Sequence, residues 1–584
     1  MICPPARCLS GSHHFLLLLA GCCATSLASQ YEHWFTYPHS SGNRILPLTA
    51  HGTFPNSVHE IDVELPSDVE WIVATCTSSE GARFVVTTSS GNAYVIHGNH
   101  LHNGTDEPVH VVQLDYTSEL RSDKPPLVRT TTISPTAAPS PPTIVQLPKA
   151  AKVSPLSHPV PVATSSIGDD EDQRQLYVYI DESDDGSGTT LYGDVVLWDD
   201  GNGRELDRIK GAEALPDGRI VIAPPGSSSE GTNDNTTLLA LYGGATSYSH
   251  CVLGDCTESS RLLLVRVADN QLTLEQSIQL PSDDVFEGIC PFFTPDGRTV
   301  VTTVANNNNG AWLQSYNLQG AVQSSGPYIG WGWRHMLFYN DFGSTDTPHP
   351  SLVDVLTPHV RMVLEFFDLK QSEMVLQDQT SRYTTHGIGS RILDTAVSGD
   401  FNGDCINEAV VLDESQTSIK SIQLMPSGEG EEGTLEAKEV WSLLLPDKLS
   451  SNLAAVALEG DGGGGIALAA ASGRTVRLWL PLALEGSTST ATTADLNDTT
   501  TIGAMTASGG GGGDNTTNGS LCSAGRPASS STDSTSLQMP REGGDTASGG
   551  SEGSRILLAP RIMYSYRDAT VPLLAICLGL LMLY

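Results

Sequence analysis

A short unit recurs between residues 212 and 470 of this chain and restricts it to a repeat architecture. In each copy a run of small or apolar residues leads into a turn that contains Asp or Gly, and a strand rich in β-branched residues usually follows. We expect the two segments of each copy to form a pair of strands linked by the turn. The copies occupy residues 212–223, 290–303, 336–356, 394–412 and 454–470. The later copies begin about 46 to 60 residues apart, which is the length of a four-stranded propeller blade. The pattern predicts an all-β fold, a β-propeller of roughly six or seven four-stranded blades.

Other changes in composition divide the chain. The 57 Gly and 34 Pro residues favour many short strands separated by turns over long helices. A Pro/Thr-rich stretch that ends in an acidic run predicts a flexible insert, and a Ser/Thr/Gly-rich stretch predicts a mucin-like stalk. We expect an N-terminal β region that contributes blades (29–128), the insert (129–172), the main propeller region (173–484), the stalk (485–555) and a C-terminal tail (556–584).

The first 28 residues have the three-part pattern of a secretory signal peptide. Arg7 lies in a short n-region, residues 15–20 form an apolar run, and Ser26 and Ala28 supply small residues at the cleavage spacing. The chain is therefore expected to enter the secretory pathway and reach the cell surface.

The C-terminal tail predicts attachment to a membrane. Residues 571–584 carry no charge, but as a helix they would span about 21 Å, less than the roughly 30 Å of a hydrocarbon core. A short apolar tail behind a Ser/Gly-rich region is typical of a signal for a GPI anchor. The spacer before the tail is long, so a GPI anchor and a short apolar anchor both remain open.

Sequons and cysteines agree with an oxidising, extracellular setting. Sequons occur at Asn103, Asn235, Asn497, Asn515 and Asn518, which become candidate glycosylation sites behind a signal peptide. Cys251 and Cys256 are spaced to close a local disulfide. The formal net charge of −36 argues against nucleic acid as a partner and favours cations.

The motif richest in chemistry lies within the fourth copy of the repeat. Residues 400–408 read DFNGDCINE, with oxygen-bearing side chains at Asp400, Asn402, Asp404 and Glu408. The carbonyl oxygen of Ile406 is expected to point the same way. Alternate residues of a tight loop converge on one point, and Ca²⁺ accepts six to eight such oxygen ligands. The alternative is an acidic turn that is held by its own hydrogen bonds.

This motif, with the preceding Gly399 and the following strand Ala409–Val411, resembles the FG-GAP/VCBS repeat family. Repeats of that family build propeller heads such as those of integrin alpha chains, and calcium sits in their blade loops. The resemblance implies that Asp400, Asn402, Asp404, Ile406 and Glu408 bind Ca²⁺. Cys405 stands where the family usually has Gly, which implies a weaker site.

A second group of candidates precedes the expected inner strands, where propellers usually bind ligands at one end of the central channel. These residues are Glu287, Arg334, His335, His386 and Arg391. Charged and imidazole groups that converge there would suit a sugar or an acidic ligand. The alternative is that they fill the channel and pair with one another.

The sequence shows no convincing catalytic site, because GxSxG, HExxH and P-loop motifs are absent. The favoured hypothesis is a binding or adhesion module for an extracellular glycan or protein. A propeller enzyme that acts on extracellular polysaccharide, as a lyase or hydrolase, is the alternative, because spatially paired carboxylates leave no sequence motif. A structural surface protein without a specific ligand is the third possibility.

Overall fold

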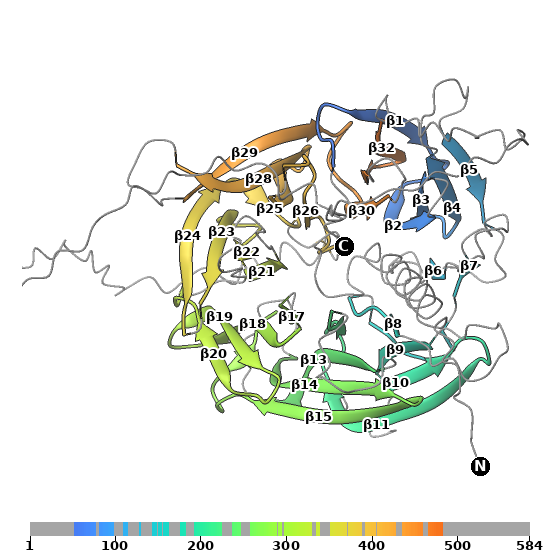
Figure 1. The fold of residues 1–584 in the computed structure, drawn as a ribbon. Helices are drawn as coiled ribbons and strands as arrows, with labels where there is room; N and C mark the ends of the chain where they lie inside the picture. Colours follow the sequence, from blue (N-terminus) through green and yellow to red (C-terminus); the bar gives the residue numbers. More distant parts are fainter. Residues whose placement is uncertain are drawn as a thin grey trace, which may run out of the picture. The chain divides into compact units, whose positions relative to one another are not determined.

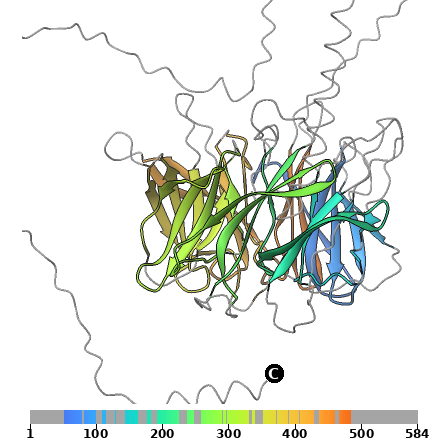
Figure 2. The same cartoon turned by 90° about the horizontal axis from the view of Figure 1, so that it is seen from below.

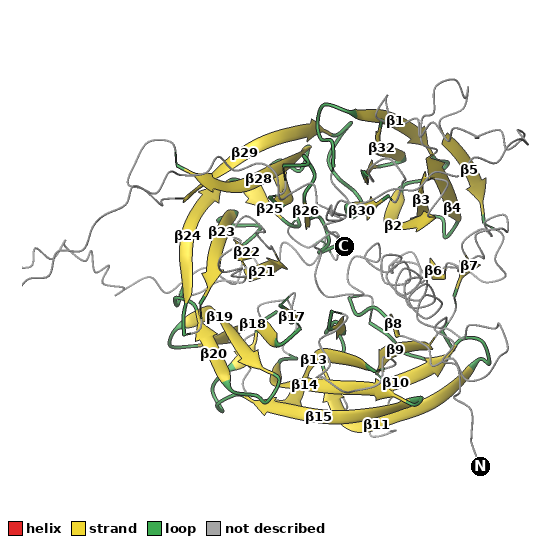
Figure 3. Cartoon of the chain, in the orientation of Figure 1, coloured by secondary structure: helices red, strands yellow, loops and turns green. Residues whose placement is uncertain are grey.

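A computed structural model describes most of the region between residues 52 and 482. The described ranges are 52–77, 81–98, 109–114, 128–129, 143–145, 147–148, 150–154, 156–162, 176–182, 192–224, 236–246, 257–288, 290–294, 297–329, 334–338, 351–370, 372–387, 390, 392–404, 406–427, 435–458 and 465–482. Within these ranges every regular element is a strand, which confirms the all-β prediction (Figure 3). The described residues contain no helix that is long and apolar enough to cross a membrane.

The strands follow the chain in order. They are β1 (Val58–Glu64), β2 (Val69–Thr77), β3 (Gly81–Thr88), β4 (Ala93–Gly98), β5 (Val109–Gln113), β6 (Val128–Arg129), β7 (Thr143–Ile144), β8 (Val160–Val162), β9 (Leu176–Asp181), β10 (Gly193–Asp199), β11 (Arg204–Ala214), β12 (Val221–Ile222), β13 (Thr237–Ala245), β14 (Ser259–Ala268), β15 (Gln271–Gln279), β16 (Val285–Phe286), β17 (Phe292–Phe293), β18 (Thr299–Asn306), β19 (Gly310–Asn317), β20 (Val322–Ser325), β21 (Arg334–Phe338), β22 (Ser351–Leu356), β23 (Val363–Leu369), β24 (Met374–Ser381), β25 (Tyr383–Thr384), β26 (Val397–Gly399), β27 (Glu408–Asp413), β28 (Ser418–Pro426), β29 (Leu435–Leu444), β30 (Ala454–Ala457), β31 (Ile466–Ser472) and β32 (Thr475–Pro481).

Consecutive strands pair antiparallel and form four-stranded sets around a common centre, the arrangement of a β-propeller (Figure 1). Our grouping of the described strands gives the sets β2–β5, β8–β11, β12–β15, β17–β20, β21–β24, β26–β29 and β30–β32 with β1. We interpret each of these seven sets as a blade. The number of blades, six or seven, stays a prediction. In the side view the strands run between two opposite faces (Figure 2).

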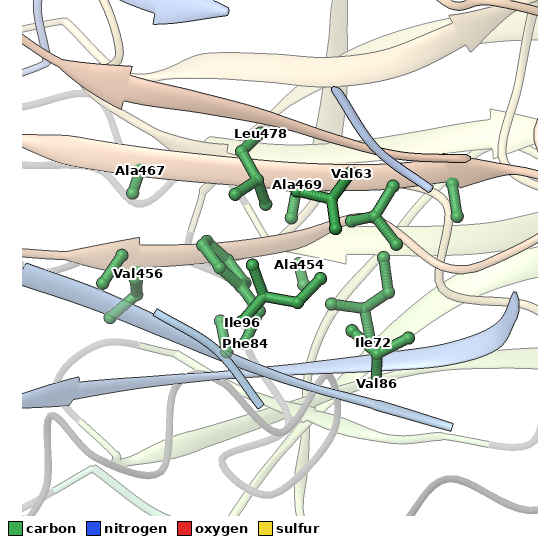
Figure 4. Close-up of a cluster of buried hydrophobic side chains, with 14 of the residues drawn as sticks. Val63, Ile72, Phe84, Val86, Ile96, Ala454, Val456, Ala467, Ala469 and Leu478 are labelled. Atoms are coloured by element: carbon green, nitrogen blue, oxygen red, sulfur yellow. The ribbon is translucent and has the colours of Figure 1, made fainter. Parts of the chain in front are cut away.

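The ring closes by joining its first strand to its last. β1 pairs along its whole length with β32, from Val58 opposite Pro481 to Glu64 opposite Thr475. The closing blade therefore contains one strand from the beginning of the domain and three from its end. Apolar side chains of this blade pack against those of β2–β4, among them Val63, Ala469 and Phe84 (Figure 4). Burial of this shared core supplies most of the force that closes the ring.

Similar apolar clusters join the neighbouring sets from the second set to the closing blade. One cluster holds β8–β10 against β12–β14, and another holds β12–β14 against β17–β19. Further clusters join the fourth set to the fifth, the fifth to the sixth, and the sixth to the closing blade. The sheets that are joined on both sides in this way are buried on both faces, which accounts for almost continuous apolar runs such as Ile466–Ser472.

The innermost strand is interrupted in several blades. β16 and β17 pair with opposite ends of β18, and β25 and β26 pair with opposite ends of β27. In the third set the end of β11 and the separate β12 both pair with β13. These interruptions carry residues out of the ladder toward the centre of the ring.

The predicted strand pairs are confirmed in four copies of the repeat. β17 and β18, β21 and β22, β26 and β27, and β30 and β31 each form the expected antiparallel pair. The prediction is wrong for residues 212–223. There the turn at Asp217–Gly218 separates two pieces of one inner strand, because Ala214 and Val221 pair with the same partner, β13.

The prediction of a flexible insert at residues 129–172 is wrong for part of it. Val160 and Val162 are fully buried, and β8 pairs with β9 as an inner strand. Val153 is buried against Tyr179 and Val196. Pro161 is tolerated because β8 lies at the inner edge of its sheet, where no partner needs its missing N–H. The proline-rich composition concealed a segment that packs by its valines.

Candidate functional site

The loop predicted to bind calcium connects β26 to β27 in the sixth blade. Gly403 adopts a φ of +80°, which favours glycine and turns the chain sharply. The amide of Gly403 donates to Asp400 Oδ1 at 2.8 Å, and the amide of Asp404 donates to Asn402 Oδ1 at 2.9 Å. The amide of Ile406 donates to Asp404 Oδ1 at 2.9 Å. The side-chain oxygens therefore shape the turn, as the alternative interpretation expected.

The loop has a buried side and an exposed side. Asp400 and Glu408 are buried, whereas Asp404 is exposed and Asn402 is partly exposed. Of the three carboxylates, only that of Asp404 is open to solvent. Cys405 lies outside the described residues.

Glu408 is the least satisfied member of this loop. Its side chain is completely buried, and Oε2 accepts the amide of Phe401 at 2.6 Å. Oε1 is buried and makes no well-formed hydrogen bond in the described part of the chain, although the nearby Trp441 indole acts to lower the pKa of the group. Burial, with smaller contributions from Asp400 and Asp404, raises the pKa of Glu408 to about 9. The carboxyl group therefore holds a proton at neutral pH unless a cation compensates its charge.

A side chain from the next strand closes the loop. Gln423 on β28 is fully buried, and its Nε2 lies 3.0 and 2.9 Å from the two carboxylate oxygens of Asp404. The same nitrogen lies 3.2 Å from the carbonyl oxygen of Ile406. One amide group thus contacts oxygens from two of the five predicted calcium ligands. Sequence reasoning missed Gln423, because a glutamine within a strand has no distinctive motif.

The N-terminal segment of the ring borders the same loop. The amides of Gly52 and Phe54 donate to the carbonyl oxygens of Asp400 and Phe401 at 2.8 and 2.9 Å. A Cβ on Gly52 would lie only 1.9 Å from the Phe401 oxygen, so only glycine permits this approach. Phe54 also stacks on Trp441, with ring centroids 5.2 Å apart. The loop is therefore packed into the closure of the ring.

A buried ion pair crosses the interior of the ring. Arg219 precedes β12 in the third blade, and Asp394 precedes β26 in the sixth, with two blades between them in chain order. Arg219 Nη1 and Nη2 donate to the two Asp394 oxygens at 2.8 and 3.3 Å, and Nε donates to the Leu156 carbonyl at 3.0 Å. Both side chains are at most 2 % exposed. A bidentate pair of this kind fixes both partners firmly.

Two of the predicted channel residues are buried within blades. Glu287 follows β16 and is 2 % exposed, and His386 follows β25 and is 5 % exposed. Burial, assisted by the neighbouring ring of His359 at 5.5 Å, lowers the pKa of His386 to about 4. His386 is therefore neutral at physiological pH, and neither residue presents an open charge to a ligand.

The remaining predicted sites lack described side chains. Arg334 and His335 lie at the start of β21, where only the strand itself is described. Other predicted sites lie outside the described residues: Arg391, Cys251, Cys256, Asn103, Asn235, Asn497, Asn515 and Asn518, together with the signal peptide, the stalk and the C-terminal tail. Among the described residues, no three His, Cys, Asp or Glu side chains form a ready metal site. A cation at the loop would thus depend on amide and carbonyl oxygens as well as carboxylates.

Comparison with known proteins finds similar solved structures but no related sequence. No protein-family model matches the chain, and no curated protein matches its sequence. The similar solved structures include the β-propeller domain of Cps50 (Swd1) from Myceliophteria thermophila, at 10 % identity and a TM-score of 0.34 over 73 % of this chain and 98 % of that one.

Two further solved structures match at similarly low identity and TM-score. The WD40 domain of Toxoplasma gondii coronin matches at 10 % identity and a TM-score of 0.35 over 75 % of this chain and 90 % of that one. The periplasmic gluconolactonase of Pseudomonas aeruginosa matches at 11 % identity and a TM-score of 0.29 over 65 % and 97 %. Because these TM-scores are low, we take the fold from the strand pairing of this chain and draw no function from these proteins.

Proposed function

We propose that this chain is a secreted, membrane-attached glycoprotein whose propeller is a binding or adhesion head for an extracellular glycan or protein. The signal peptide, the sequons and the uncharged tail support the location. The local resemblance of residues 399–411 to FG-GAP/VCBS repeats supports the kind of propeller.

The observation that carries the proposal is the buried Arg219–Asp394 pair. It ties two blades together across the ring, so the groups at this level hold the scaffold and are not available to a ligand. The burial of Glu287 and His386 has the same consequence. Recognition is then left to the loops on the two faces, which a rigid scaffold presents at fixed positions.

Calcium at residues 400–408 is the second part of the proposal. The donor set suits a hard cation, because it combines Asp400, Asp404 and Glu408 with the oxygens of Asn402 and Ile406. The buried Glu408 Oε1 is an acceptor that needs a partner, and a bound cation would supply it. A bound Ca²⁺ would compensate the charge of these carboxylates and stiffen the loop beside the ring closure.

The test is a binding screen with the full-length chain displayed on cells. Surface staining, before and after phospholipase treatment, checks the location and distinguishes a GPI anchor from an apolar anchor. Arrayed glycans and matrix proteins are then presented in calcium and in chelator. We expect a defined ligand whose binding weakens in chelator and in Glu408→Gln, but not in the control Asp283→Asn, an exposed carboxylate on another blade. Surface display without selective binding would contradict the proposed function.

A further inference from the structure

Two buried oxygen atoms at the acidic loop lack a well-formed hydrogen bond. They are Glu408 Oε1 and Gln423 Oε1, and neither has a partner of good geometry among the residues that the structure describes, although the Trp441 indole lies close enough to Glu408 to lower its pKa. Both residues are 0 % exposed. A buried acceptor without a partner costs about 1 to 3 kcal/mol, so two together at one loop point to a missing positive group.

The nitrogen of Gln423 occupies the position that such a group would take. It lies within 3.2 Å of three oxygens, two from Asp404 and one from Ile406. These contacts fix which end of the amide faces the loop, because an oxygen there would face three other acceptors. Gln423 Nε2 thus takes the place of a cation. Oε1 of the same side chain points away from these oxygens and is buried without a donor.

We propose that Gln423 is a further calcium ligand that serves as a substitute for the ion in the metal-free loop. When Ca²⁺ enters, the side-chain amide turns so that Oε1, in place of Nε2, faces the ion. The turn replaces three hydrogen bonds with contacts to the cation and satisfies the oxygen that lacked a partner. Gln423 therefore competes with calcium in the metal-free state and holds it in the bound state. This inference rests on the calcium part of the proposed function.

The proposal sets Gln423 apart from a merely structural glutamine. A structural glutamine would change stability equally with and without calcium. If Gln423 both competes with calcium and binds it, substitutions of Gln423 change the calcium affinity. The affinity rises or falls according to whether the new side chain supplies an oxygen ligand. Gln314 on β19 is a matched control, because its amide also makes side-chain hydrogen bonds, to Trp312 and Tyr316, in a different blade.

The experiment measures calcium affinity by titration calorimetry on the full-length chain and four variants, with thermal midpoints in calcium and in chelator. Gln423→Glu should bind calcium about tenfold more tightly than wild type, because it adds a fourth carboxylate to the site. In chelator it should melt at a lower temperature, because a carboxylate has no N–H to donate to Asp404. Gln423→Met should bind about tenfold more weakly, since it supplies no oxygen. Gln314→Met should bind like wild type, and Glu408→Gln should lose binding.

The outcomes separate the two proposals. If wild type binds calcium and both Gln423 variants bind equally well, the role of Gln423 is overturned and the calcium site stands. Tighter binding by Gln423→Met would show that the residue only competes, which also overturns it as a ligand. If neither wild type nor Gln423→Glu binds calcium, both the site and its extra ligand are overturned. Should Gln423→Met fail to fold, the isosteric Gln423→Glu decides alone.

Discussion

Asp394 and Glu408 are two buried carboxyl groups of the same blade with opposite solutions to burial. Asp394 faces Arg219, whose guanidinium forms two hydrogen bonds to it. Glu408 has no cationic side chain among its hydrogen-bond partners, and burial, together with two further carboxylates, raises its pKa. The comparison indicates that Asp394 is neutralised by a partner within the scaffold, whereas the charge of Glu408 is compensated only by a proton or a bound cation.

Removing the partner of Arg219 should produce the largest effect. Asp394→Ala leaves a guanidinium buried without its counter-charge, and such losses cost about 3 to 5 kcal/mol. We expect the free energy of unfolding in urea to fall by that amount. The double variant Arg219→Met with Asp394→Leu should recover part of it. A loss below about 1 kcal/mol in the single variant would contradict the role of this pair in the scaffold.

The buried imidazole of His386, which is neutral at pH 7, should give the next largest effect on stability. The pKa of His386 is about 4 in the folded chain, against about 6.5 when unfolded, so the unfolded chain binds more protons between these values. Stability is therefore lost as pH falls from about 6.5 to 4, by about 3 kcal/mol in total. Comparing urea unfolding of wild type and His386→Phe across this range isolates the contribution. Parallel pH profiles would refute it.

Glu408→Gln tests the other half of the comparison in chelator at pH 7. The raised pKa of Glu408 means that the folded chain keeps a proton that the unfolded chain releases, so stability falls as pH rises from about 4.5 to 9. The amide removes this cost, and we expect a gain of about 2 kcal/mol in unfolding free energy. Asp283→Asn is the control and should change little. A destabilised Glu408→Gln would show that the carboxylate is already compensated without metal.

An exposed ion pair should give the smallest effect. Arg477 on β32 contacts Asp62 on β1 through two hydrogen bonds of 2.7 Å, but the Asp62 side chain is 45 % exposed. Surface pairs of this kind contribute at most about 1 kcal/mol. Thermal melting of Asp62→Ala should therefore shift only slightly, because Arg477 keeps Glu60 and the Leu444 carbonyl oxygen as partners. A large shift would mean that charge, and not the shared apolar core, closes the ring.

Turns and strands that depend on a short stretch of residues were predicted from the sequence. The turn at Asp400 and the strand that follows it were placed correctly, because alternating donors and β-branched residues occur within one short segment. Arg219 and Asp394 were missed because they lie 175 residues apart, and Arg219 follows an ordinary Asp-Gly turn. Gln423 was missed because its role depends on the register between β27 and β28. The burial of the β8 valines was missed as well, because it depends on pairing with β9 and the surrounding composition is rich in proline.

The pairing of β1 with β32 has a consequence for biosynthesis. Glu64 and its partner Thr475 are 411 residues apart, so the first strand leaves the ribosome long before its partner exists. Until then the edges of β1 lack their native partner, and exposed edges invite pairing with other chains. The propeller can reach its final stability only after residue 481 has been synthesised. Nascent chains of this protein should therefore depend on chaperones for most of their translation.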